Sequence, residues 1–338
     1  MTTKGPLSTT VGPPRRASVW AEALPTLAIA MLLLLWIGES GYRESLVNLF
    51  TVYALLALGL YIPFIMGGAL SLAYNAYLGI GALSVALIGT RTDLSMLLAI
   101  PIGVVIAVVV AVVLGLVTRG LSGFFLAAVT LLFGITFQRW LVTSPEITGG
   151  ASGIGGIPDL TLFGWTVDRR AIVAAGVFIL WALILAVSRA RRAQFGIALR
   201  AQAEIRAAAD ASGVRTKALD IVALGIGAAI ASVAGSQLAL VNQFVQAESF
   251  SVHLVFLAIF MPLLGGRSTP WGVAVGAALV IQFTINLDLF EQAGSLMFGV
   301  AVLFVLLVAP EGILGYLGLA VRWVRDRLHL GGEGGQHG

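Results

Sequence analysis

The chain has 338 residues, of which 59% are apolar and only 11% are charged, with a net charge of +4 at pH 7. A soluble domain carries about a quarter charged residues because its surface must be hydrated, so this composition excludes an ordinary soluble protein. The chain has no cysteine, which excludes disulfides, thiolate metal sites and cysteine nucleophiles.

Residues 1–22 are polar and contain prolines and basic side chains, and we expect them to form a retained cytoplasmic tail. No small-residue cleavage site lies at the distance that a signal peptide requires. Beyond this tail, runs near the roughly 20 apolar residues that cross a bilayer predict about ten transmembrane helices. The segments 24–38 and 253–266 are shorter than a full crossing and are therefore open to being tilted, broken or re-entrant. The predicted segments are 24–38, 46–66, 68–89, 94–118, 121–143, 171–188, 218–241, 253–266, 270–287 and 293–309.

The basic residues fall mainly on one side of this arrangement. Ten crossings place both termini and the 189–217 loop together, and that side receives 15 of the 20 Lys and Arg residues. The other side receives 4, and Arg139 lies within a span. Because cytoplasmic loops are enriched in Lys and Arg, both termini are predicted to be cytoplasmic. The predicted fold is an all-α polytopic membrane helix bundle, with a transmembrane domain at 23–315 and a cytoplasmic tail at 316–338.

Two connections are long. The external one, 144–170, is too rich in glycine and proline for a plain helix. A glycine-rich loop that binds phosphate follows a strand and begins a helix, and neither is visible in this part of the sequence. We therefore interpret the connection as a tight turn that packs over a pore or against a partner. The internal one, 189–217, is basic and alanine-rich, and predicts a helix from Ala193 to Asp210 that is interrupted at Gly196. The candidate residues of the external loop are Thr148, Gly149, Gly150 and Gly153.

The chain lacks the groups that an enzyme would need. Its histidines have no metal-binding spacing, and there is no GxSxG motif for a serine nucleophile. Neither of the two lysines, Lys4 and Lys217, stands in the GxxxxGK[ST] loop that binds nucleotide phosphates. The basic residues form no patch interleaved with aromatic residues, so nucleic acid is not an expected partner. We therefore predict no catalytic residues, no metal and no cofactor, and a separate polypeptide must hydrolyse ATP if transport depends on it.

Polar residues inside a predicted span are informative because they are costly to bury in lipid. Ser71, Tyr74 and Asn75 occupy one stripe of the predicted helix 68–89, at i, i+3 and i+4. The stripe lies beside Gly79 and Gly81. It is consistent with a lining for a translocation pathway and equally with hydrogen bonds between helices.

Other residues within the spans carry weaker signals. Gly272 and Gly276 form a GxxxG pair, which is typical of close helix packing in membranes. Arg139 lies near the outer end of its span, where its side chain is expected to reach the headgroups. A direct contact with a substrate carboxylate is the alternative. Further candidates for a polar lining are Gln237, Gln282 and Asn286.

The internal stretch from Arg200 to Gly213 gives the strongest signal. Its small residues allow a short helix to dock in a groove of another protein, and Gly213 allows the chain to turn back. A helix that lies on anionic headgroups would carry large apolar anchors, whereas this one has an alanine face, so a protein partner is favoured. The predicted contact residues are Arg200, Glu204, Ala208, Ala209 and Gly213.

Several short motifs follow one another in a specific order from about Leu46 to Leu314. They include Leu70-Ser71-Leu72, Gly79-Ile80-Gly81, Thr148-Gly149-Gly150, Ala198-Leu199-Arg200 and Leu264-Gly265-Gly266. In these motifs the chain resembles the branched-chain (hydrophobic) amino acid ABC importer permeases, in particular the second of two permease subunits that pair as a heterodimer.

The resemblance implies an ABC importer permease fold that works by alternating access. It implies two cytoplasmic ABC ATPase subunits that use ATP, a second homologous permease in a heterodimer or homodimer, and an external solute-binding protein. In such importers a helix matching Arg200–Gly213 couples the ATPases to the pore. The family usually has Gln-Leu-Ser-Leu-Gly-His where this chain has residues 69–74, which leaves urea, amides or another small solute open as substrates. An ATP-independent secondary transporter is the alternative outside this class.

Overall fold

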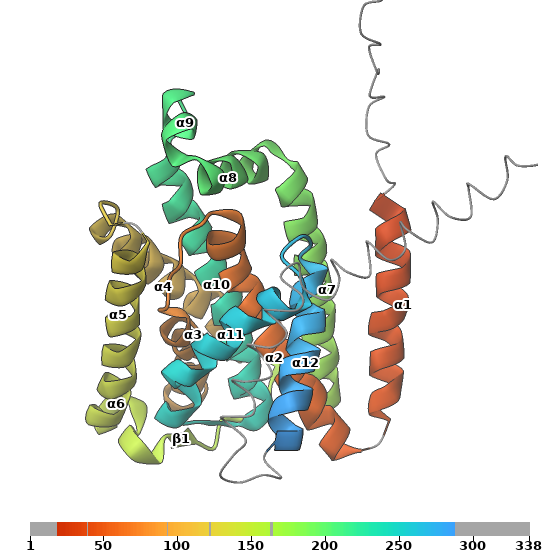
Figure 1. Ribbon diagram of the computed structural model, residues 1–338. Coiled ribbons are helices and arrows are strands. Elements are labelled where there is room, and N and C mark those ends of the chain that lie inside the picture. The colour runs from red at the N-terminus through yellow and green to blue at the C-terminus, as the bar shows by residue number, and fades with distance from the viewer. Residues whose placement is uncertain (1–18, 39, 93, 122, 163–164, 288–338) are drawn as a thin grey trace, which may run out of the picture.

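The computed structural model describes residues 19–38, 40–92, 94–121, 123–162 and 165–287 (Figure 1). Its helices are α1 (Val19–Ile37), α2 (Gly41–Tyr61), α3 (Tyr74–Arg91), α4 (Met96–Val117), α5 (Phe124–Thr143), α6 (Pro145–Thr148), α7 (Arg169–Arg192), α8 (Gln194–Glu204), α9 (Arg206–Ala211), α10 (Thr216–Asn242), α11 (Val252–Gly265) and α12 (Trp271–Leu287). A π-helical turn, η1 (Ile62–Met66), extends α2, and two 3₁₀ turns are η2 (Gly150–Ser152) and η3 (Ala247–Phe250). Four short strands form two antiparallel pairs, β1 (Ile154–Gly155) with β4 (Phe244–Val245) and β2 (Thr161–Leu162) with β3 (Trp165–Thr166).

The apolar runs of the sequence form helices as predicted, except the last, 293–309, which lies outside the described residues. Within the described residues, five helices are long and apolar enough to cross a membrane: α2 with η1, α4, α5, α7 and α10. α1 has 19 residues and is longer than the predicted segment 24–38. α11 has 14 residues and rises only about 21 Å, less than the roughly 30 Å of a bilayer core, which agrees with the short segment predicted at 253–266.

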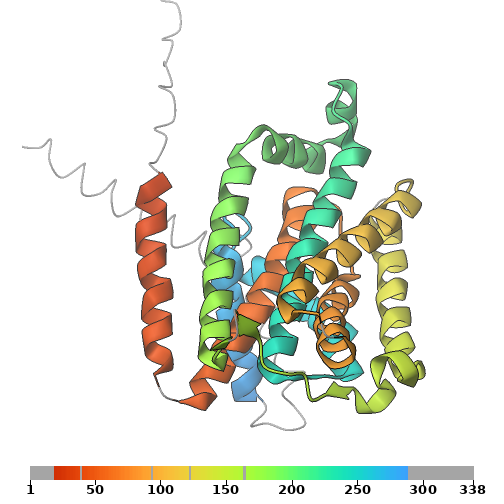
Figure 2. The same cartoon turned by 180° about the vertical axis from the view of Figure 1, so that it is seen from behind.

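α10 lies at the centre of the bundle. It packs against α2, α3 and α4, while α11 and α12 form a close pair beside α2. Figures 1 and 2 show α1 and α5 at opposite edges, α8 and α9 at one end, and α6 and β1 at the other. α4 and α5 leave many of their apolar side chains exposed, at positions such as Val105, Val109 and Leu132, as expected of helices that face lipid or another subunit.

The central helices touch through their backbones. A β-carbon at Gly235 of α10 would lie 1.8 Å from the carbonyl oxygen of Leu78 in α3, and one at Gly81 would lie 1.9 Å from that of Ser232. Because burying apolar side chains gains little in lipid, membrane helices associate by such close contacts. The GxxxG pair lies at the α11–α12 contact, where a β-carbon at Gly276 would lie 1.8 Å from the carbonyl oxygen of Met261.

We expect Gly235→Ala to lower the melting temperature of the purified protein, and Gly225→Ala on the same helix to leave it unchanged. The added methyl group at Gly235 meets backbone atoms that cannot rotate away, whereas at Gly225 its nearest neighbours are valine methyl groups at 3.7 Å. Overpacking of this kind costs about 1–3 kcal/mol, which corresponds to a decrease of roughly 2–10 °C for a chain of this size. Thermal unfolding in detergent, followed by intrinsic fluorescence, measures both variants. Equal melting temperatures would show that the α3–α10 contact is not tight.

One predicted helix is shorter than expected. The sequence pattern places residues 68–89 on a single helix, but α3 begins only at Tyr74, and residues 68–73 have no regular structure. This corrects the predicted stripe, since Ser71 precedes the helix and has no helical spacing to Tyr74. The cause is local: η1 ends at Met66 with Gly67 as its C-cap, and Gly68 has a φ of +70°, which turns the chain back into the bundle.

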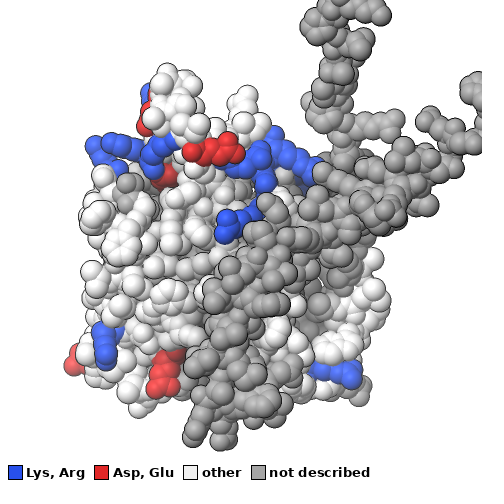
Figure 3. All heavy atoms as spheres, in the orientation of Figure 1, with Lys and Arg blue, Asp and Glu red and all other residues white. Residues whose placement is uncertain are grey.

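The charged side chains gather at the two ends of the bundle. Figure 3 shows blue Lys and Arg side chains concentrated at the end formed by α8 and α9, a wide uncharged band, and fewer charges at the opposite end. This separation fits a protein that crosses a membrane, because the band exposes apolar side chains and the ends can be hydrated. The end that carries α8 and α9 is called the basic end below.

Candidate functional site

The α8–α9 segment (Gln194–Ala211) lies across the basic end of the bundle (Figure 1). The sequence predicts one helix from Ala193 to Asp210 interrupted at Gly196, and this prediction is wrong in detail. The break lies at Ile205, whose backbone is extended with φ −140° and ψ 89°. Gly196 instead lets α8 approach the end of α7, since a β-carbon there would lie 2.3 Å from the carbonyl oxygen of Ala190.

Polar contacts fasten the segment to α10. The Asp220 carboxylate accepts a hydrogen bond from the Gln202 amide at 2.6 Å and forms an ion pair with Arg206 at 2.5 Å. The Thr216 hydroxyl donates to the Asp210 carboxylate at 2.7 Å. These contacts join both sides of the Ile205 break to the start of α10, so the two short helices are held to α10 as a pair.

A second group of contacts joins α8 to the ends of other helices. Arg200 donates to the carbonyl oxygens of Gly196 and Arg191 at 3.3 and 3.2 Å. The Arg191 guanidinium donates to the Tyr61 hydroxyl, and both side chains donate to the carbonyl oxygen of Arg267, at 3.2 and 3.1 Å. The end of α2, the end of α7 and the α11–α12 turn therefore meet beneath α8.

α8 also rests on the non-helical stretch that follows α2. The buried Leu199 side chain lies 3.2 Å from the position that a β-carbon at Gly67 would occupy. Ala203 lies 3.3 Å from the position that a β-carbon at Gly68 would occupy. Residues 69–73 then run into the interior, where the backbone N–H of Leu72 donates to the Thr130 hydroxyl of α5 at 2.8 Å. A movement of α8 therefore reaches the interior through directly contacting atoms.

The outer surface of the α8–α9 segment is uncharged over much of its area. Ala201, Glu204 and Ala208 are exposed, as expected for a contact surface, and Ala209 is buried. The surface also carries Ile197 and Ile205, whose side chains are 54% and 62% exposed. Neither was predicted, because the alanines of this stretch were taken as its whole contact face. Their spacing, four residues on either side of Ala201, was the signal available.

The polar residues near the start of α3 are buried and bonded to neighbouring elements. The Asn75 amide donates to the carbonyl oxygens of Gly134 in α5 and Phe250 in η3, at 3.0 and 3.1 Å. The Tyr74 hydroxyl donates to the carbonyl oxygen of Gly59 in α2 at 3.1 Å. Of the two alternatives for these residues, hydrogen bonding between elements is present, and a role in a translocation pathway stays a prediction.

Two of the remaining candidates within the spans, Gly79 and Gln237, lie at helix contacts. Gly79 faces Phe137 of α5, and its position leaves no room for a β-carbon, which would lie 2.5 Å from the ring. The Gln237 amide donates to the Asn48 side chain at 3.1 Å inside the bundle. Arg139 is exposed near the outer end of α5, where its side chain can reach the headgroups. Gln282 lines an apolar pocket of about 760 Å³ between α1, α2 and α12, and the side chain of Asn286 lies outside the described residues.

The long connection 144–170, which the sequence predicts to be external, is compact and lies at the end of the bundle opposite α8 and α9. Thr148 is buried and donates to the carbonyl oxygen of Leu141 at 2.6 Å, and its hydroxyl accepts from the N–H of Gly150. Gly149, Gly150 and Gly153 all have positive φ. A β-carbon at Gly153 would lie 2.4 Å from the carbonyl oxygen of Val245, where β1 and β4 pair. These glycines therefore allow the loop to fold tightly against the chain after α10.

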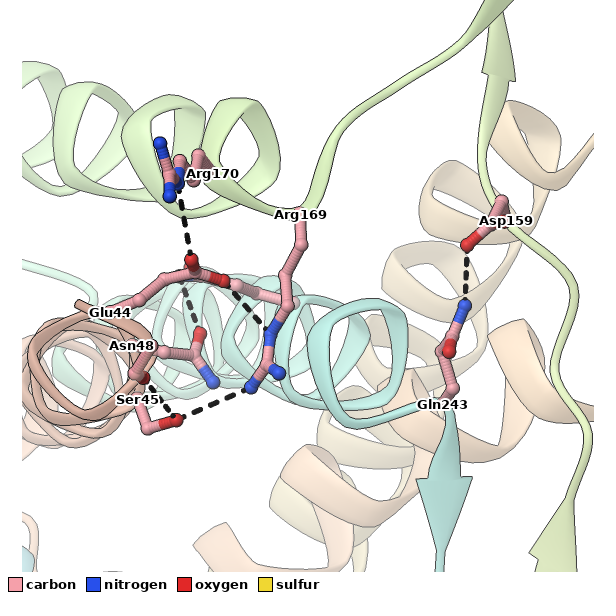
Figure 4. Close-up of polar contacts among 9 residues, drawn as sticks. Glu44, Ser45, Asn48, Asp159, Arg169, Arg170 and Gln243 are labelled. Carbon is pink, nitrogen blue, oxygen red and sulfur yellow. Dashed lines mark hydrogen bonds and ion pairs between the residues drawn. The ribbon is translucent and has the colours of Figure 1, made fainter. Parts of the chain in front are cut away.

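A charged cluster lies beside this loop (Figure 4). The Glu44 carboxylate, only 6% exposed, contacts the guanidinium groups of Arg169 at 2.9 Å and Arg170 at 3.8 Å. On the other side of the view, the Gln243 amide donates to the Asp159 carboxylate at 2.6 Å. In the sequence pattern these residues lie only in predicted loops. The cluster fixes the start of α7 on the start of α2, because an unpaired buried carboxylate would be costly.

In the part of the chain that the structure describes, no group of three or more His, Asp and Glu residues is placed to hold a metal ion. The basic end presents an exposed face on α8 and α9 that is in contact with the interior, and the opposite end presents a compact loop.

Comparison with known proteins agrees with this geometry. A family model described as the permease component of branched-chain amino acid transport systems matches residues 42–309. The chain is 27% identical to the high-affinity branched-chain amino acid transport system permease protein LivM of Escherichia coli, over 88% of this chain and 75% of that protein. It is 28% identical to the LivM protein of Salmonella typhimurium, over 78% and 68%, and 29% identical to a probable LivM protein of Methanocaldococcus jannaschii, over 50% and 53%. No solved structure matches the chain.

Proposed function

Because the chain belongs to the family of branched-chain amino acid transport permeases, we propose that it is the membrane-spanning permease subunit of an ATP-binding-cassette importer for branched-chain or other hydrophobic amino acids. The names of the most similar curated relatives support this substrate class. Urea, amides or another small solute are alternatives within the same family. Separate ATPase subunits supply the energy, since the chain has no nucleotide-binding loop.

The proposed orientation places the basic end and both termini in the cytoplasm of a bacterial cell. The concentration of Lys and Arg at that end supports it. With the apolar segment 293–309 as a further crossing, the domain has about ten helices. Residues 1–22 and 316–338 are then cytoplasmic tails.

In this proposal the α8–α9 segment is the docking element for the ATPases. The observation that carries it is the combination of an exposed face with direct contacts to the interior through Gly67, Gly68 and Leu199. When the ATPases close, they move α8. The non-helical stretch 67–73 moves together with α8, and the packing around Asn75 changes as a result. Irregular backbone at membrane depth is tolerated where it is buried in protein or lines a cavity, and transporters place binding sites at such broken helices.

The remaining partners complete the importer. A second homologous permease, as a heterodimer or a homodimer, lies alongside this chain, and the translocation pathway includes the region of Ser71, Tyr74, Asn75, Gly79 and Gly81. An external solute-binding protein docks at the opposite end, where the loop with Thr148, Gly149, Gly150 and Gly153 is exposed at its edges. Alternating access then transfers the solute. The permease shifts between an outward-facing and an inward-facing state, and bound ligands change the populations of these two states.

Single-cysteine cross-linking tests the proposal without background, because the natural chain has no cysteine. We expect Glu204→Cys to cross-link to an ATP-binding subunit in native membranes, and Asp159→Cys at the opposite end to give no such product.

Reconstitution of the transporter provides a second test of the proposed function. Leucine uptake should require the complete complex and ATP, and uptake by the purified chain alone would identify a secondary transporter instead. Competition by leucine, urea and acetamide separates the substrate classes.

A further inference from the structure

Two adjoining pockets open at the basic end, away from the outer face of the α8–α9 segment. One, of about 560 Å³, lies between the end of α4 and the start of α10 and is lined by Arg119, Asp210, Arg215, Lys217 and their neighbours. The other, of about 580 Å³, is an apolar groove between α4, α7 and α10. Ile221 lines both pockets, so a charged recess continues directly into an apolar groove.

The charged recess favours an anion. Arg119, Arg215 and Lys217 are exposed and form no ion pair with any residue in the described part of the chain. The carboxylate in the recess, Asp210, already accepts the hydrogen bond from Thr216. The recess also lies at the N-terminus of the 27-residue helix α10, where backbone N–H groups and the helix dipole attract negative charge.

The groove below it favours an alkyl chain. Its walls are apolar side chains of three helices in the half of the bundle nearest the basic end, among them Val108, Val112, Leu183 and Ala186. Val222 and Ile226 of α10, also in the groove, are 48% and 40% exposed, which is unusual for the helix at the centre of the bundle. A charged recess at the membrane surface above an apolar groove at acyl-chain depth matches the two parts of a phospholipid.

We propose that this composite pocket binds one anionic phospholipid of the cytoplasmic leaflet. Its phosphodiester lies among Arg119, Arg215 and Lys217, and one acyl chain lies in the groove along Ile221 and Val112. The assignment of the leaflet rests on the proposed function, which places the basic end in the cytoplasm. Basic pockets between membrane helices on that side bind anionic headgroups, and a free phosphate would leave the apolar groove unoccupied.

The position of the pocket gives the lipid a regulatory role. Asp210 and Thr216, which join α9 to α10, line the recess. A bound headgroup therefore contacts the connection between the proposed docking element and the centre of the bundle. Occupancy stabilises one position of α9 relative to α10, and with it the response to the ATPases.

Native mass spectrometry of the full chain, purified from nanodiscs of phosphatidylcholine with and without phosphatidylglycerol, tests the headgroup site. We expect one phosphatidylglycerol to be retained in preference to phosphatidylcholine. In the double variant Arg119→Gln/Lys217→Gln its retention falls about thirty-fold, since each basic residue near an anionic headgroup contributes about five-fold. The matched double variant Arg189→Gln/Arg267→Gln, which removes two charges from the same end outside the pocket, retains the lipid. Equal loss in both would show only general charge attraction and overturn the proposal.

The groove is tested separately. Ala186→Phe fills it and should reduce retention at least about five-fold through steric overlap, whereas Ala182→Phe, one turn away on α7 and outside the groove, leaves it unchanged. Unchanged lipid retention in Ala186→Phe would show that no acyl chain binds in the groove. Lipid bound to the isolated chain but absent from the assembled complex would show that a partner subunit covers the groove. Neither readout depends on ATP or on transport, so both are independent of the test of the proposed function.

Discussion

Ala208→Trp is expected to reduce ATP-driven solute uptake about thirty-fold, because a bulky side chain at the centre of a docking surface costs about 2 kcal/mol or more of binding free energy. Ala208 is exposed on α9, beyond the Ile205 break and beside Glu204. The indole ring would hold the ATPase surface away from Ile197 and Ile205, the large exposed apolar side chains of this face. Uptake into vesicles containing the complete complex, together with the amount of ATPase that co-purifies, measures the effect.

The same substitution at Ala193 provides the control. Ala193 is exposed at the same end of the bundle but lies in the turn between α7 and α8, outside the two helices of the docking element. We expect Ala193→Trp to assemble and transport normally. Normal uptake and normal ATPase recovery in Ala208→Trp would show that the partner subunit binds elsewhere.

Asp220→Ala is expected to uncouple the transporter. The complex should still hydrolyse ATP, but the amount of solute moved per ATP should fall about ten-fold. An effect of this size is within the usual range of coupling free energies between sites. The Asp220 carboxylate contacts both Gln202 of α8 and Arg206 of α9. Without it, the α8–α9 segment can still bind an ATPase, but its motion is transmitted less completely to α10. Parallel measurement of leucine uptake and phosphate release in proteoliposomes gives the ratio.

A double-mutant cycle identifies the Arg206 pair as the cause. Arg206→Ala should uncouple to a similar extent, and the double variant Arg206→Ala/Asp220→Ala should be no worse than either single variant, because residues in one contact are non-additive. Additive losses would mean that the two side chains act independently. Unchanged stoichiometry in all three variants would exclude this contact as a route for coupling.

Much of this architecture follows from local sequence patterns. Long apolar runs predict the helices α2, α4, α5, α7 and α10, because the energetic cost of placing polar groups in lipid acts on every residue of a span. The positions of Lys and Arg predict which loops share an end, and the short α11 follows from the short apolar run. The order of small motifs predicts the family, which the match over residues 42–309 confirms.

What the sequence did not predict depends on contacts between distant segments. The non-helical backbone at residues 68–73 is stabilised by Thr130, nearly sixty residues away, so local helical spacing misplaced Ser71. The break at Ile205 similarly depends on Asp220, which contacts the chain on both sides of it. The buried carboxylate of Glu44 is paired only because α7 begins beside α2, and neither helix alone contains that information.

α10 runs without interruption for 27 residues, about 40 Å at the rise of an α-helix. Its first turn is tied to α9 by Thr216, and the strand that follows its last turn pairs with the external loop through Ile154 and Val245. In the proposed orientation, one uninterrupted helix is therefore fastened to a candidate docking segment on each side of the membrane. We propose that docking of a loaded binding protein outside and nucleotide binding inside both act on this helix, without a relay through flexible loops.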